Sequence, residues 1–125
     1  MRPYFRSEVT SVGSDATDLI NGGVTIFFAE PCPTELMEVS IVHRTIQVDP
    51  QRDPYPGDVL RVGESEVVLT AVGAAAGDNL RNLGHLVVYC NPNAGQVLLP
   101  GAVLAAGEIG TPSPGALVEI TPGVS

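Results

Sequence analysis

The sequence predicts a mainly β protein: a small closed or partly closed β-barrel with one or two short helices. Glycine (14 residues) and proline (11 residues) are frequent enough to interrupt long helices. Runs of β-favouring residues are short, and clusters of turn-forming residues separate them. A chain of 125 residues with 44% hydrophobic residues can bury one core. We therefore expect residues 1–125 to form a single domain.

Nine short runs have the alternation or the apolar character of strands. In chain order they are Tyr4–Val12, Val24–Ala29, Val39–Val48, Val59–Val62, Glu66–Val72, Leu86–Cys90, Val97–Leu99, Ala102–Ala105 and Ala116–Ile120. Short strands at such close spacing are typical of a small barrel or sandwich.

Two segments break this rhythm and predict short helices. Ser14–Ile20 begins with a candidate N-cap serine and carries acidic residues in its first turn. Ala74–Leu83 offers Asp78 or Asn79 as its cap and meets a stop signal at Gly84. Each helix would have about two turns.

The charge pattern excludes several classes of partner. The chain has 6 basic and 14 acidic residues, a formal net charge of −8, and every basic residue is a scattered arginine. Such a surface gives no nucleic-acid footprint and repels anionic lipid, whereas it attracts a basic protein partner. Without lysine the chain cannot form the usual phosphate-binding loop.

The cysteines and the longest apolar runs point to a cytoplasmic protein. Cys32 and Cys90 lack metal-binding or redox spacing, so we expect both to be reduced thiols. The longest apolar runs fall well short of the ~20 residues that span a bilayer, and polar residues occur within the first eight positions. We therefore expect neither membrane insertion nor a secretion signal.

His43 and His85 are the only histidines, and acid–base or nucleophilic chemistry near neutral pH is expected to use them. Strand alternation places His43 on the apolar face of Ile41, half-buried and open at one edge, and turns Arg44 toward solvent. His85 follows Gly84 at a helix-to-strand junction. A hydrogen-bonded packing role remains the alternative for either ring. The spacing indicates no metal site.

Two segments resemble a known family. They are Thr70–His85, which reads TAVGAAAGDNLRNLGH, and Phe28–His43, which reads FAEPCPTELMEVSIVH. Both are similar to signatures of the glucitol/sorbitol-specific enzyme IIA family of the bacterial phosphoenolpyruvate-dependent sugar phosphotransferase system. The resemblance extends from the strand before Gly13 to the Pro114–Gly115 step.

The resemblance implies a cytoplasmic phosphocarrier with a phosphohistidine intermediate and no cofactor or metal. Such a domain takes a phosphoryl group from the histidine phosphocarrier protein and passes it to the IIB domain of a sugar-specific IIB/IIC permease. By position in the motif, His43 matches the phosphoryl acceptor. His85 would support it, with Asn79 and backbone N–H groups from Gly73 onward as phosphate-stabilising donors. Such transfer requires mainly positioning and hydrogen-bond donors.

Two other functions remain open: a non-catalytic regulatory or binding module on the same fold, and a ligand-binding barrel with a lined cavity. The segments Asp49–Gly57 and Cys90–Gly95 depart from the family pattern and are candidates for partner choice. A homodimer is also left open, with the strand that ends at Ile120 pairing across a dimer edge.

Overall fold

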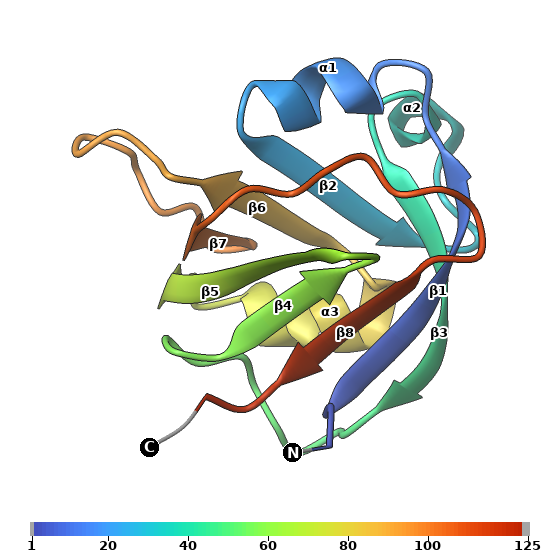
Figure 1. Cartoon of the computed structure of the whole chain (residues 1–125). Helices are drawn as coiled ribbons and strands as arrows, with labels where there is room; N and C mark the ends of the chain where they lie inside the picture. The colour runs from blue at the N-terminus through green and yellow to red at the C-terminus, as the bar shows by residue number, and fades with distance from the viewer. Residues whose placement is uncertain (1, 124–125) are drawn as a thin grey trace.

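The computed structural model describes residues 2–123 as a closed barrel of eight strands with three short helices (Figure 1). The strands are β1 (Phe5–Val12), β2 (Val24–Ala29), β3 (Ile41–Val48), β4 (Val59–Val62), β5 (Ser65–Val72), β6 (Leu86–Cys90), β7 (Ala102–Ala106) and β8 (Leu117–Thr121). The helices are α1 (Ala16–Asn21), α2 (Thr34–Met37) and α3 (Ala76–Leu83). The predicted fold class is confirmed.

The strands follow the order β1-β3-β2-β6-β7-β5-β4-β8 around the barrel. The pairs β2–β3 and β6–β7 are parallel, and the other neighbours are antiparallel. Parallel neighbours cannot be joined by a tight hairpin, so longer connections occur here, over residues 30–40 and 91–101. Strand β2 places Phe27 between Ile41 of β3 and Leu86 of β6. This register brings the two histidine-bearing segments together.

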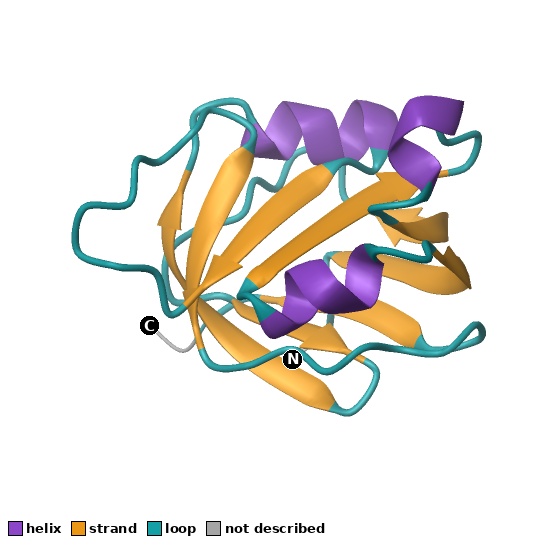
Figure 2. Cartoon of the chain, turned by 90° about the horizontal axis from the view of Figure 1, so that it is seen from above, coloured by secondary structure: helices purple, strands orange, loops and turns teal. Residues whose placement is uncertain are grey.

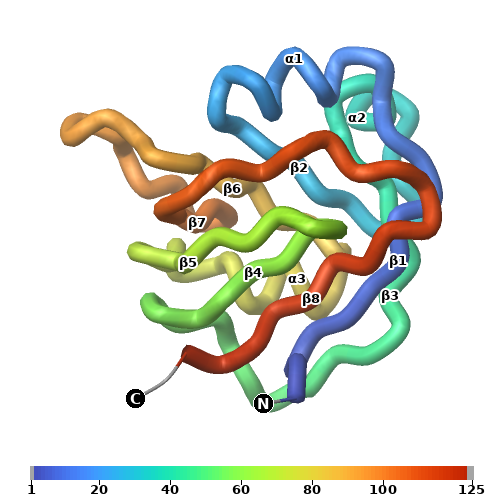
Figure 3. Tube along the Cα trace, viewed as in Figure 1, coloured from blue at the N-terminus to red at the C-terminus, as the bar shows by residue number. Residues whose placement is uncertain are grey.

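Strand β8 is paired on both sides, with β1 and with β4. A closed barrel has no edge strand whose backbone groups are free to pair with another chain. The strand that ends at Ile120 thus offers no free edge for the pairing across a dimer that the sequence left open. The described ends of the chain lie at the same end of the barrel (Figure 3).

Inward-facing side chains of the strands fill the barrel. The largest apolar ones with almost no exposure are Phe5, Ile41, Leu60, Leu69, Leu86 and Ile120. A barrel of this strand number is just wide enough for side chains to fill. Burying each of them contributes roughly 1.5–3 kcal/mol before the entropy of ordering is counted.

The helices lie around the outside of the strands (Figure 2). Helices α1 and α3 match the two predicted helices within a few residues. The predicted cap of α3, Asp78 or Asn79, is wrong, because the helix starts earlier and Ala75 takes the N-cap position without a side-chain hydrogen bond. Helix α2 has four residues after Pro33, too few to give a periodic signal, and was not predicted.

The predicted strand Val97–Leu99 does not form. These residues lie in the connection between β6 and β7, which projects from the barrel (Figure 1), and Val97 is 68% exposed. The N–H of Ala102 bonds the carbonyl of Leu99 across a turn. Residues that favour strands stay irregular here because β7 already fills the place beside β6.

Candidate functional site

His43 lies on β3, opposite Val9 of β1 and Ala29 of β2, and its side chain points into the barrel. Only 1% of the residue is exposed. The rings of Phe5 and Phe27 meet it edge-on, with centroids 6.0 Å and 6.1 Å away. The predicted inward orientation is confirmed, but the expected open edge is absent, because the closed barrel and the aromatic rings seal the imidazole.

The two ring nitrogens of His43 have different surroundings. Nε2 lies 2.7 Å from the carbonyl oxygen of Gly84. A carbonyl only accepts, so Nε2 carries the proton and donates. Nδ1 is buried and has no partner among residues 2–123. Burial lowers the pKa of His43, and the bond to Gly84 offsets this only in part. The ring is therefore neutral, with an unused lone pair on Nδ1.

Gly84 makes this contact possible because it has no side chain. Its φ of +59° is left-handed and ends α3. A Cβ at this position would overlap the Cβ of Ala29 and would lie 2.9 Å from Cε1 of His43. Only glycine lets the end of α3 approach β2 and the buried ring this closely.

His85 follows Gly84 and is half-buried. Its Nδ1 lies 3.0 Å from the carbonyl oxygen of Phe27 and donates to it. Its ring lies against that of Phe28, with centroids 4.9 Å apart and planes tilted by 37°. Within the described part of the chain Nε2 has no hydrogen-bond partner, and it is not among the buried unpaired atoms. In the neutral ring, Nε2 then has a lone pair that no described residue uses.

Phe27 connects the two histidines. Its ring packs against His43 inside the barrel, and its carbonyl oxygen binds His85. His43 in turn binds the residue before His85. Strands β2 and β3 and the turn after α3 thus hold both imidazoles in one connected arrangement. An imidazole with one nitrogen anchored and the other open can act as a nucleophile or as a proton acceptor.

Gly73 and Asn79 do not join this arrangement. The N–H of Gly73 bonds the carbonyl of Ala102, so it is already used, and a Cβ there would overlap the carbonyl of Leu99. The side chain of Asn79 lies beside Gly101. A pocket of about 350 Å³ is lined by Gly73 but includes neither histidine. The predicted donor at Gly73 is therefore not free in this structure.

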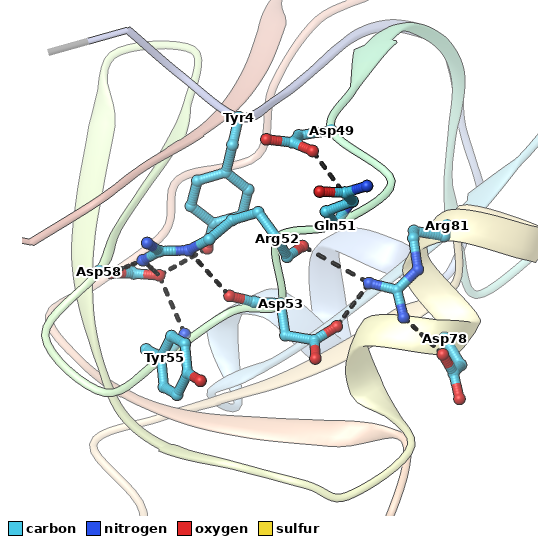
Figure 4. Close-up of polar contacts among 9 residues, drawn as sticks. All are labelled: Tyr4, Asp49, Gln51, Arg52, Asp53, Tyr55, Asp58, Asp78 and Arg81. Carbon is cyan, nitrogen blue, oxygen red and sulfur yellow. Dashed lines mark hydrogen bonds and ion pairs between the residues drawn. The ribbon is translucent and has the colours of Figure 1, made fainter.

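A second buried polar cluster surrounds Asp58 (Figure 4). Its carboxylate accepts hydrogen bonds from four residues: the Tyr4 hydroxyl at 2.6 Å, the Arg52 guanidinium at 3.0 Å, and the N–H groups of Tyr55 and Gly123 at 2.9 Å. Burial alone raises the pKa of Asp58, but these donors outweigh it and the pKa is lowered. Burial, together with Asp58, raises the pKa of Tyr4.

The Asp58 cluster was not predicted from the sequence. It anchors the proline-rich segment 49–57 to segments near both ends of the chain, since Tyr4 lies just before β1 and Gly123 just after β8. Arg81 of α3 continues the network to Asp53 and Asp78, as Figure 4 shows. Tyr4 and Gly123 lie 54 and 65 residues from Asp58, so no local pattern marks the cluster.

Other reactive groups offer little chemistry. Cys32 and Cys90 are free, and burial raises the pKa of both thiols, which disfavours the nucleophilic thiolate. Between residues 2 and 123, no three ligand-type side chains gather as a metal site would need. None of the helices in this range has the length and apolar character to cross a membrane.

Comparison with known proteins agrees with the fold. Residues 4–119 match the family model of the PTS system glucitol/sorbitol-specific IIA component. The glucitol/sorbitol-specific EIIA component of Shigella flexneri is 30% identical over 109 residues, which cover 87% of this chain and 86% of the relative. Its counterpart from Escherichia coli K12 is 29% identical over the same shares.

A solved structure is also similar. The crystal structure of a PTS system IIA component from Enterococcus faecalis V583 superposes with a TM-score of 0.80. The match covers 95% of this chain and 99% of that one at 20% sequence identity, which supports the barrel fold. From the family model and the curated relatives, the chain belongs to the glucitol/sorbitol-specific IIA components of the phosphotransferase system.

Proposed function

We propose that this chain is a cytoplasmic phosphocarrier with a phosphohistidine intermediate. It accepts a phosphoryl group from the histidine phosphocarrier protein and passes it to the IIB domain of a glucitol/sorbitol-type IIB/IIC permease. Family membership supports a phosphotransferase role in sugar transport. The connected pair of His43 and His85 supports an imidazole as the carrier.

His43 is the proposed acceptor, as the sequence resemblance implies, and His85 supports it. One observation carries this choice: Nδ1 of His43 is buried inside the barrel with no partner among residues 2–123, while Nε2 binds the Gly84 carbonyl directly before His85. Because only 1% of the residue is exposed, the ring has to become accessible when a partner docks.

The proposed transfer is an in-line displacement between two imidazoles. The lone pair on a ring nitrogen of His43 forms a new P–N bond as the P–N bond of the donor phosphohistidine breaks. The electron pair of the broken bond stays on the nitrogen of the donor imidazole, which becomes a neutral acceptor again. The other ring nitrogen of His43 keeps its proton, and a carbonyl oxygen such as that of Gly84 can compensate part of the positive charge that develops on the ring.

Intact-mass spectrometry tests this proposal. The protein is incubated with phosphoenolpyruvate, the general phosphotransferase enzyme and the histidine phosphocarrier protein. We compare wild type with His85→Gln, His43→Gln and the exposed control Glu66→Gln. We expect one acid-labile, base-stable phosphoryl adduct on every protein except His43→Gln. Phosphorus NMR of the wild-type adduct identifies the ring nitrogen that carries the phosphoryl group.

Two outcomes would contradict the proposal. An adduct that is lost with His85→Gln and kept with His43→Gln would move the acceptor role to His85. A wild-type protein that takes up no phosphoryl group, while its partners are active, would favour the alternative of a regulatory or binding module.

A further inference from the structure

The ladder between β1 and β3 places two hydroxyl side chains beside His43. Ser7 is paired with Thr45, two positions along the ladder from the pair that contains His43, and no register shift separates the two pairs. Because side chains alternate between the faces of a strand, Ser7 and Thr45 lie on the inner face with His43. The exposed ion pair between Glu8 and Arg44, one position along, marks the outer face.

The Ser7 hydroxyl is fully buried and has no hydrogen-bond partner among residues 2–123. On the inner face of β1 it lies between Phe5, whose ring packs against the imidazole of His43, and Val9, which is paired with His43. A serine hydroxyl can donate one hydrogen bond. Next to the proposed acceptor, no described residue uses that donor.

Thr45 is exposed, although it lies on the same inner face as the buried His43. The pairing of β2 with β3 stops at Ala29 and His43, so β2 does not cover the inner face of β3 beyond that point. Residues two apart on a strand are about 7 Å apart, and the Cβ atoms of paired residues are about 5 Å apart. Both hydroxyls are therefore within reach of a phosphoryl group on the ring, and Thr45 lies on the accessible side.

A phosphoryl group on His43 needs hydrogen-bond donors, because its negative charge is spread over three oxygens during transfer. The aromatic rings of Phe5 and Phe27, which contact the imidazole, offer none. The backbone N–H of Gly73, which the sequence predicted as a donor, is already bonded elsewhere. The hydroxyls on the inner faces of β1 and β3 are the polar groups left beside the ring on this part of the described barrel.

We infer that the hydroxyl groups of Ser7 and Thr45 bind the phosphoryl group on His43, each donating a hydrogen bond to one of its oxygens. The inference rests on the proposed function, in which His43 is the acceptor. The hydroxyls form and break no covalent bond; they stabilise the charge on the phosphoryl oxygens during transfer and in the phosphohistidine. The buried Ser7 hydroxyl, unpaired in the free protein, gains a partner when the phosphoryl group arrives.

Single-turnover transfer from the phosphorylated histidine phosphocarrier protein tests this inference. Ser7→Ala and Thr45→Val remove one hydroxyl each, and Thr45→Ser keeps the hydroxyl. Ser40→Ala is the control for Ser7→Ala, because its hydroxyl is also buried and unpaired but lies three residues from His43, about 10 Å along an extended chain. Thr70→Val is the control for Thr45→Val, because Thr70 is an exposed threonine on β5, four strands from β3 in either direction around the barrel.

We expect the maximal transfer rate to fall by about 10- to 100-fold in Ser7→Ala and by about 10-fold in Thr45→Val, where water can replace the hydroxyl. Thr45→Ser should recover most of the loss, and both controls should transfer like wild type. The half-saturating donor concentration should not change in Ser7→Ala, because Ser7 is buried. The phosphorus NMR signal of the phosphohistidine should shift in Ser7→Ala and Thr45→Val, and urea unfolding should show that Ser7→Ala is no less stable than wild type.

The inference is overturned if Ser7→Ala and Thr45→Val transfer as fast as wild type, if Thr45→Ser is as slow as Thr45→Val, or if the controls are slowed equally. In each of these cases the wild-type adduct still forms and is lost with His43→Gln. Failure of the proposed function looks different, because the adduct would persist in His43→Gln or no wild-type adduct would form.

Discussion

Asp58 and His43 each join distant segments of this barrel and are almost equally buried, yet they differ greatly in the number of hydrogen bonds that they make. Asp58 is 2% exposed and receives hydrogen bonds from four residues. His43 is 1% exposed and makes a single hydrogen bond. Near the start of β3 and on the neighbouring β1, the hydroxyls of Ser40 and Ser7 are also buried without partners in residues 2–123.

The difference separates a structural cluster from the proposed phosphoryl-transfer site. A buried carboxylate whose oxygens are all bonded stabilises the segments that it joins. Buried polar atoms without partners cost free energy, and a functional role is one reason for their presence. The segments that resemble the family, Phe28–His43 and Thr70–His85, build the histidine site. The segment Asp49–Gly57, which departs from the family pattern, is held by the hydrogen bond from the N–H of Tyr55 to Asp58.

The largest effect is expected from Asp58→Ala. It leaves the Tyr4 hydroxyl and two backbone N–H groups unpaired and frees the charge of Arg52, whose side chain is 31% exposed. We expect the free energy of unfolding to fall by about 3 kcal/mol, the lower end for a broken buried pair because Arg52 can turn to water. Urea unfolding measures this change.

Asp53→Ala is the control for Asp58→Ala. Asp53 also binds an arginine, but its side chain is 59% exposed, so the change should stay within about 0.5 kcal/mol. Equal losses for the two variants would mean that the buried cluster is no more important to stability than a surface ion pair.

Gly84→Ala addresses the histidine site. The new Cβ would overlap Ala29 and press on Cε1 of His43, and the left-handed backbone would be strained. We expect a loss of about 2 kcal/mol in the free energy of unfolding and slower phosphoryl transfer. Gly115→Ala is the matched control, because Gly115 also has positive φ but no atom near its Cβ position. A similar loss in both variants would assign the effect to backbone strain alone.

Much of the fold could be predicted from the sequence because the signals are local. Alternation in Glu66–Val72 marks β5, and Gly84 marks the end of α3. A strand also needs a neighbouring strand to pair with. The strand predicted at Val97–Leu99 was therefore wrong, although its residues favour strands. Helix α2 was missed because one turn leaves no periodicity.

The site was predictable only in part. Alternation gave the inward direction of His43, but the depth of its burial depends on closure of the barrel by strands far away in sequence. Two of the four partners of Asp58, Tyr4 and Gly123, are 54 and 65 residues distant in sequence. No spacing rule links positions so far apart, so the cluster is visible only in the folded chain.

The lowered pKa of His43 leads us to expect acid-sensitive stability. The unfolded imidazole takes up a proton near its ordinary pKa of 6.5, while the buried ring resists it. The unfolded state therefore binds more protons as the pH falls through this value, and the free energy of unfolding drops by up to about 1.4 kcal/mol per pH unit. The lowered pKa of Asp58 affects the free energy of unfolding in a separate pH range, below the ordinary pKa of 3.8.

Urea unfolding at about pH 7.5 and about pH 5.5 measures this dependence. In His43→Gln, which has no titrating group at the site, the decrease should become smaller. If the wild type and the variant lost stability in parallel, the buried ring would have no share in the acid sensitivity.

Ser7→Ala should have the smallest effect, and the opposite sign. Ser7 lies inside the barrel on β1 between Phe5 and Val9, and its hydroxyl oxygen is buried with no partner in the described chain. Removing this hydroxyl deletes an unpaired polar group at little cost in volume, so we expect the free energy of unfolding to rise by up to about 1 kcal/mol.

Ser65→Ala is the control for this sign, because the Ser65 hydroxyl accepts a hydrogen bond from the N–H of Gly110 at 2.8 Å. Its loss should lower the free energy of unfolding by about 0.5–1 kcal/mol, as for an ordinary hydrogen bond. Opposite signs in the two serine variants would support the distinction between bonded and unbonded regions of the barrel. If Ser7→Ala also destabilised the protein, the buried polar groups around His43 would be as fully hydrogen-bonded as those of the Asp58 cluster. Buried polar atoms without partners would then no longer distinguish the histidine site.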